Sequence, residues 1–155
     1  MDRSVHMNVQ TTRFGVVDVD ESRIITFPAG LLGFPSFKHY ALLQPDDEGV
    51  FFWLQAVDAP PLAFVVTDPS LWVEDYVAAI RPEQMKQLSL DTLANAQVFA
   101  IVNKYDRSLT ANLQGPLVIN SLNRRAMQLV LADKRWATRH EIVQVGESVV
   151  QAASA

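Results

Sequence analysis

The residues in this chain that could perform acid–base or metal chemistry are three histidines and several carboxylates. His6, His39 and His140 are far apart in the sequence, and none belongs to a metal-binding H-E-x-x-H pattern. The nucleophile pattern G-x-S-x-G and the phosphate-binding pattern G-x-x-x-x-G-K-[ST] are also missing. A catalytic triad can assemble from distant positions, so spacing alone does not exclude an enzyme. The motif evidence nevertheless predicts a protein without catalysis and without a cofactor.

Two acidic runs could bind a cation or a basic partner. Asp18, Asp20 and Glu21 alternate oxygen ligands as a calcium loop does, but the required glycine and the distal glutamate are missing. We therefore expect no metal there, only a strand end and a turn. The second run, Asp46-Asp47-Glu48, precedes Gly49. A solvated turn explains this run, and so does an electrostatic contact that speeds association with a basic protein.

Composition restricts the class of partner. The chain has 155 residues, 49% of them hydrophobic, and a formal net charge of −4. This length and apolar content predict a single domain, and the acidic balance argues against direct nucleic-acid binding. The sequence has no cysteine, no apolar segment typical of a signal peptide and no apolar run long enough to span a bilayer. We expect a cytoplasmic protein without a membrane partner.

Large aromatic side chains are the natural anchors for a partner protein. Phe51, Trp53 and Tyr76 combine large contact area with few rotatable bonds, and Trp72 and Trp136 are further candidates. Core packing is the alternative interpretation, and for Trp53, within a predicted strand, it is the better one.

Two segments have the composition of sharp corners between buried strands. The first runs from Phe27 to Pro35 and the second from Thr110 to Asn120. Each combines large apolar residues with prolines that fix φ and glycines that allow positive φ. In the second corner, Asn112 and Asn120 carry amides that can bond backbone groups across a turn. The residues assigned to these structural corners are Pro28, Gly30, Gly33, Asn112, Gly115 and Pro116.

The remaining pattern is one of short strands separated by turn signals. Predicted strands are 9–11, 14–19, 23–27, 40–44, 50–57, 62–67, 98–102, 116–120, 127–131 and 141–145. A helix is predicted from Pro82 to about Leu88, and a second short turn over 74–80. We therefore expect a mainly β fold: a compact antiparallel β-barrel-like domain over 1–155 with one or two short helices. Its core covers about 7–145, and the termini, 1–6 and 147–155, are the parts expected to be disordered.

The clearest hairpin joins 50–57 to 62–67 through a loop of hairpin length. Phe52, Leu54 and Ala56 face one side of its first strand, whereas Phe51 and Trp53 face the other. Apolar residues on both faces predict that both are covered, either by the protein itself or by a partner.

The ordered set of motifs resembles the flagellar assembly factor FliW, a small bacterial protein family. The set consists of the two corners together with Arg13-Phe14-Gly15, Phe52-Trp53-Leu54-Gln55-Ala56-Val57, Phe64-Val65-Val66-Thr67-Asp68-Pro69 and Tyr76. In order and spacing the resemblance extends from about Met7 to about Ile142.

The resemblance implies a cytoplasmic protein with a compact β-barrel-like fold and two partners. These are flagellin, the filament subunit, and CsrA, an RNA-binding translational repressor, so that flagellin synthesis is linked to its use. An acidic surface suits the basic repressor, and an apolar patch suits the amphipathic terminal helix of a filament subunit. The candidate partner-binding residues are Phe51, Trp53, Tyr76, Asp46, Asp47 and Glu48. The alternative is a β-barrel that binds a small ligand or acts as a hydrolase, which requires a deep polar pocket with a perturbed titrating group.

Overall fold

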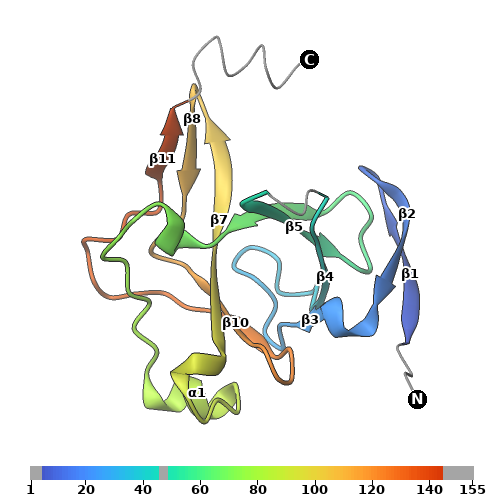
Figure 1. Cartoon of the computed structure of the whole chain (residues 1–155), viewed down its shortest axis with the longest axis horizontal. Helices are drawn as coiled ribbons and strands as arrows, with labels where there is room; N and C mark the ends of the chain where they lie inside the picture. Colours follow the sequence, from blue (N-terminus) through green and yellow to red (C-terminus); the bar gives the residue numbers. More distant parts are fainter. Residues whose placement is uncertain (1–4, 46–48, 145–155) are drawn as a thin grey trace.

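The computed structural model describes residues 5–45 and 49–144. The strands in this part of the chain are β1 (His6–Thr11), β2 (Gly15–Asp20), β3 (Ile24–Thr26), β4 (His39–Leu43), β5 (Phe51–Ala56), β6 (Ala63–Thr67), β7 (Ala96–Tyr105), β8 (Ser108–Ala111), β9 (Leu117–Asn120), β10 (Ala126–Gln128) and β11 (His140–Gln144). The helical segments are α1 (Pro82–Gln87) and three short 3₁₀ turns, η1 (Glu21–Arg23), η2 (Pro69–Leu71) and η3 (Leu93–Asn95). The mainly β prediction is confirmed (Figure 1).

A separate two-stranded sheet begins the described chain. β1 and β2 pair antiparallel from His6 opposite Asp20 to Thr11 opposite Gly15. The polar turn predicted after this hairpin is η1, which Asp20 caps by accepting a 2.9 Å hydrogen bond from the Ser22 N–H. That backbone hydrogen bond lowers the pKa of the Asp20 carboxyl.

The other nine strands form one antiparallel sheet with the order β10-β9-β7-β6-β5-β4-β3, and β8 joins β7 to β11 beside this path. The predicted β5–β6 hairpin is confirmed, with Phe51 opposite Thr67 and Gln55 opposite Ala63. β7 is long enough to pair with three other strands. Its first residues pair with β9, and its later residues pair with β6 and β8. Figure 1 shows β7, β8 and β11 rising together from the body of the molecule.

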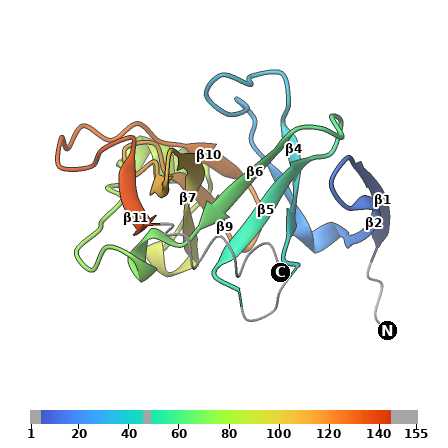
Figure 2. The same ribbon diagram turned by 90° about the horizontal axis from the view of Figure 1, so that it is seen from above.

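The large sheet curls until its two ends meet. Thr26, in the last strand of the order, forms an isolated parallel bridge with Arg125, and its N–H donates to the Arg124 carbonyl at 3.0 Å. A single bridge is not a continuous ladder, so the sheet is barrel-like without being closed as a barrel. Figure 2 shows the strands from above, with β4, β5 and β6 side by side.

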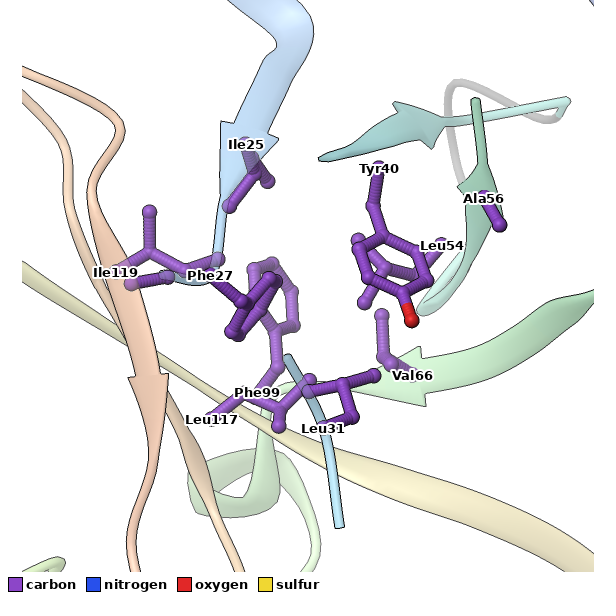
Figure 3. Close-up of a cluster of buried hydrophobic side chains, with 11 residues drawn as sticks. Ile25, Phe27, Leu31, Tyr40, Leu54, Ala56, Val66, Phe99, Leu117 and Ile119 are labelled. Carbon is purple, nitrogen blue, oxygen red and sulfur yellow. The ribbon is translucent and has the colours of Figure 1, made fainter. Parts of the chain in front are cut away.

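Among the residues that the structure describes, the buried hydrophobic side chains form three clusters. The first lies inside the curl of the sheet and combines residues from the first corner, β4, β5, β6, β7 and β9 (Figure 3). Within it Phe27 and Tyr40 are fully buried and meet edge to face, 5.6 Å between ring centres. The second cluster lies around Leu113 and Trp136, and the third joins the β1–β2 hairpin to β4.

Some predicted elements differ from the structure. Residues 74–80, predicted as a second short turn of helix, are irregular after a turn at 74–75. The strand predicted over 127–131 ends at Gln128 in β10, because Leu129 and Leu131 donate their N–H groups to Pro116 and Gln114 in the second corner instead of a strand. Within the described residues no helix is both long and apolar enough to cross a membrane.

Candidate partner-binding surface

Trp53 lies on the outer face of β5, half-buried beneath the turn of the β1–β2 hairpin. The Arg13 guanidinium is centred 4.2 Å from the Trp53 ring, a cation–π contact. Phe14 approaches the same ring edge to face at 5.8 Å. The Thr12 N–H donates to the Pro60 carbonyl at 3.0 Å, which ties this turn to the β5–β6 loop. The hairpin turn therefore partly covers Trp53.

Phe51 lies two residues before Trp53, on the same face of β5. It stacks on Trp72 with ring centres 5.8 Å apart. The Trp72 indole N–H donates to Thr67 Oγ1 at 3.1 Å, and that hydroxyl donates to the Val50 carbonyl at 2.7 Å. The structure thus brings Phe51 and Trp53 to one face, each covered in part by a different segment. The opposite face of β5 supplies Leu54 and Ala56 to the first core cluster, as the sequence predicts.

Tyr76 lies elsewhere, in the second cluster. Its hydroxyl donates to the Leu113 carbonyl at 2.7 Å, and its ring meets Trp136 edge to face at 4.8 Å. Burial raises the pKa of this phenol. Tyr76 therefore holds the second corner against the irregular segment before α1. The acidic run 46–48 lies outside the described residues.

The first corner places a tight turn at the surface. Leu31 and Phe34 exchange backbone hydrogen bonds across Leu32 and Gly33. Both predicted glycines have positive φ, +68° at Gly30 and +86° at Gly33. A Cβ on Gly30 would come within 2.6 Å of the Phe34 carbonyl oxygen, whereas one on Gly33 would meet nothing within 4 Å. Leu32 is 62% exposed at the tip.

The second corner is held by amides. Asn112 Oδ1 accepts from the Gly115 N–H at 2.9 Å, and the buried Asn120 side chain donates to the Leu88 and Ser89 carbonyls. Gly115 lies outside the set of positive-φ glycines, contrary to expectation. A Cβ there would lie 2.9 Å from Asn112 Nδ2, so close packing explains this glycine.

Two glutamines that sequence reasoning missed organise these loops. Gln128 accepts from the Leu32 N–H at 2.9 Å and donates to the Gly115 carbonyl at 3.0 Å, which joins the two corners. Gln55 is fully buried, and its amide nitrogen contacts four carbonyls in or beside the β5–β6 loop, at 3.0–3.2 Å. In each case a glutamine within an otherwise apolar strand pattern is the sequence signal that indicates a side chain bonded to backbone groups.

The titratable residues are dispersed. His6 Nδ1 lies 3.4 Å from Asp18 and His6 Nε2 lies 3.9 Å from Asp20, while His39 and His140 are on β4 and β11. No three histidine, cysteine, aspartate or glutamate side chains gather as a metal site within residues 5–45 and 49–144.

Comparison with known proteins identifies the family. A family model described as FliW protein matches residues 8–142, most of the chain. The chain belongs to the FliW family. A flagellar assembly factor FliW from Treponema denticola is 40% identical over 139 residues, which cover 88% of this chain and 94% of the relative. The FliW of Geobacter sulfurreducens is 40% identical over 136 residues, 86% of this chain and 85% of the relative.

A solved structure supports the same conclusion for the fold. A crystal structure of the flagellar assembly factor FliW superposes with a TM-score of 0.81 and 29% sequence identity, covering 88% of this chain and 97% of the other. The mainly antiparallel architecture is therefore that of FliW. The motifs that suggested the family, from Met7 to Ile142, occupy nearly the same range as the family match.

Proposed function

We propose that this FliW-family chain binds flagellin and a CsrA-type translational repressor, and so couples flagellin synthesis to flagellar assembly. The observation that carries the proposal is membership of a family of flagellar assembly factors over 8–142. The net charge of −4 supports a basic partner such as an RNA-binding repressor, because opposite charges speed encounter. The same charge disfavours a direct role in binding RNA.

Partner exchange needs no catalysis. Free flagellin occupies the protein and leaves the repressor active, and export of flagellin releases the protein to bind the repressor. Such competition follows from mass action alone. We accordingly propose a cytoplasmic, non-enzymatic, chaperone-like regulator, with no cofactor in its cycle.

The outer face of β5 is the proposed contact for flagellin. Phe51 and Trp53 lie there two residues apart on one face, and both are half-buried. Val50, just before this strand, is also 37% exposed. An amphipathic helix recognises such a surface through apolar residues spaced three and four apart.

Purified proteins test this function directly. The chain is mixed with flagellin, with the repressor, and with both, and complexes are measured by size-exclusion chromatography and calorimetry. We expect a complex with each partner at micromolar concentrations and release of the repressor when flagellin is added. Absence of both binary complexes would contradict the proposal and favour a small-ligand-binding role.

A further inference from the structure

The β1–β2 hairpin has an open strand edge whose direction can be worked out from its register. The Glu21 N–H donates to the Val5 carbonyl at 2.7 Å, which extends the ladder by one hydrogen-bonded pair beyond His6 and Asp20. Hydrogen-bonded and non-bonded pairs alternate in an antiparallel ladder. The N–H and C=O groups of Val16 and Asp18 therefore point away from β1, and so does the N–H of Asp20, whose C=O accepts within η1. Within the described residues no strand pairs with β2 on that side.

A groove of about 450 Å³ lies along this edge. One wall is β2, and the opposite wall is the end of β4 with the residues that follow it, Leu42–Pro45. Phe14, just before β2, and Arg23, in η1 just after it, also line the groove. Figures 1 and 2 both show the hairpin at one end of the large sheet, on the side of β3 and β4. The groove therefore follows Val17–Asp20 of β2, and its lining is largely apolar.

The side chains of β2 alternate in chemistry as well as direction. Val17 and Val19 face the body, where Val19 packs with Ala41 and Leu43. Asp18 and Asp20 lie on the other face, with side chains 67% and 37% exposed. The His6 ring lies within 4 Å of both carboxylates, and Arg23 is the arginine among the residues that line the groove. An added strand would meet valines on one face and carboxylates on the other.

We propose that the groove beside β2 is a strand-addition site for an extended peptide of a partner protein in which apolar and basic residues alternate. The outward N–H and C=O groups of Val16 and Asp18 and the outward N–H of Asp20 supply the main-chain pairing. Apolar side chains of the peptide continue the row of Val17 and Val19 toward Leu42 and Leu43. Lysine or arginine side chains lie beside Asp18 and Asp20, where opposite charges on neighbouring strands attract.

Charge distinguishes this edge from the other edge of the same hairpin. On β1 the corresponding residues are His6, Asn8 and Gln10, which carry no carboxylate. A basic strand therefore favours β2. The proposal concerns the chemical class of the ligand, goes beyond the partner roles proposed above, and does not depend on them.

The ligand side of the test uses synthetic peptides of about nine residues, a length within the usual range for strands. One peptide alternates lysine and valine, and its counterpart alternates glutamate and valine. Two further lysine–valine peptides are N-methylated at alternate residues, one in each phase, so that only one of them loses the N–H groups facing β2. Calorimetry is expected to show binding of the lysine–valine peptide and at least about tenfold weaker binding of the glutamate peptide. Of the two N-methylated peptides, only the one that keeps the N–H groups facing β2 should still bind.

The protein side compares paired substitutions. Val16→Pro removes an N–H from the β2 edge, and Gln10→Pro does the same at the directly opposite position on β1. Asp18→Asn removes a charge at the groove, and Asp106→Asn removes one in the β7–β8 turn, where asparagine suits the positive φ of +56°. We expect Val16→Pro and Asp18→Asn to weaken the lysine–valine peptide at least about fivefold relative to their controls.

Amide hydrogen exchange of the unmutated protein provides a readout that does not depend on any variant folding. Binding should slow exchange at Val16, Asp18 and Asp20 and leave Asn8 and Gln10 unchanged. The proposal is overturned by absence of lysine–valine peptide binding up to millimolar concentration, by equal binding of the glutamate peptide, or by protection on β1 rather than β2. Equal affinity of the protein for the two N-methylated peptides would also overturn it.

Discussion

The side chain of Gln128 accepts a hydrogen bond from the backbone N–H of Leu32, 96 residues away in the sequence. The same amide donates to the Gly115 carbonyl, so one side chain holds both corners. Without this side chain, the Leu32 N–H and the Gly115 carbonyl lose these hydrogen bonds and must be hydrated instead.

We expect Gln128→Ala to lower the free energy of unfolding by about 1–3 kcal/mol, because two hydrogen bonds are lost together. The free energy of unfolding of Gln128→Glu should lie between those of Gln128→Ala and the unmutated protein. Its carboxylate can accept from the Leu32 N–H but cannot donate to the Gly115 carbonyl. Urea denaturation measures both. The matched control is Gln97→Ala, at an exposed position of β7, and equal effects of Gln97→Ala and Gln128→Ala would show that the bridge contributes nothing.

The two glycines of the first corner should respond differently to substitution. Gly30→Ala must place a Cβ 2.6 Å from the Phe34 carbonyl oxygen in addition to adopting positive φ, whereas Gly33→Ala pays only for the backbone conformation. We expect about 1 kcal/mol for Gly33→Ala and at least about 2 kcal/mol for Gly30→Ala. Thermal melts of both variants decide the order. A reversed order would mean that the corner relaxes around a Cβ at position 30.

Tyr40 carries a buried hydroxyl without a hydrogen-bond partner among the described residues, inside the first core cluster (Figure 3). Replacing it by phenylalanine removes an unsatisfied polar group while keeping the ring. We expect Tyr40→Phe to be neutral or to stabilise the protein by up to about 1 kcal/mol near pH 7. Tyr105→Phe, at an exposed ring, is the control. A marked loss of stability in Tyr40→Phe alone would indicate a partner for the hydroxyl.

Alkaline pH supplies a second test of the same residue. Burial raises the pKa of Tyr40 from 10 to about 12, so between these values the unfolded chain has lost a proton that the folded chain keeps. Stability should therefore fall as pH rises from about 10 to about 12. Tyr40→Phe should show a shallower decline, measured by urea denaturation across this range. An identical decline would assign the effect to other groups.

The aromatic face of β5 can be tested by truncation. We expect Phe51→Ser or Trp53→Ser to weaken flagellin binding by about 2–4 kcal/mol while leaving repressor binding largely intact, because central aromatic anchors dominate interface energies. Arg13→Leu keeps the Trp53 ring and removes the guanidinium above it. This variant therefore separates the contribution of the Trp53 ring from that of its cation–π contact. Titration calorimetry with flagellin gives the affinities. Loss of the cooperative unfolding transition would assign the side chain to the core instead.

The acidic run 46–48 is expected to affect rate more than affinity. Replacing Asp46, Asp47 and Glu48 by Asn, Asn and Gln should slow association with the repressor at low salt, and the difference should shrink as ionic strength rises. Stopped-flow measurement across salt concentrations checks this. An unchanged association rate at low salt would exclude a steering role for the run.

Local patterns predicted the strands well because hydrophobic alternation and turn chemistry act over short distances. The β5–β6 hairpin, the polar turn after Asp20 and the helix after Arg81 all follow from neighbours within a few residues. β8 was missed because Ser108–Ala111 is short and only partly apolar, and its pairing with β7 and β11 decides its conformation. Tyr76 lies apart from Phe51 and Trp53 because long-range contacts also decide its position. It contacts Leu113 and Trp136, which are distant in the sequence and which no local pattern specifies.

The isolated bridge between Thr26 and Arg125 sets an order of events for a chain emerging from the ribosome. β3 to β6 lie within 24–67 and pair with their sequence neighbours, so they can associate early. The edge at Thr26 has no partner until residue 125 has been synthesised, and Gln128 follows only three residues later. During that interval the first corner lacks its support and the strand edge is exposed to other nascent chains. Premature termination before residue 125 should therefore yield aggregation-prone fragments, whereas chains that extend through β11 should associate less, because they close this contact and complete the second cluster.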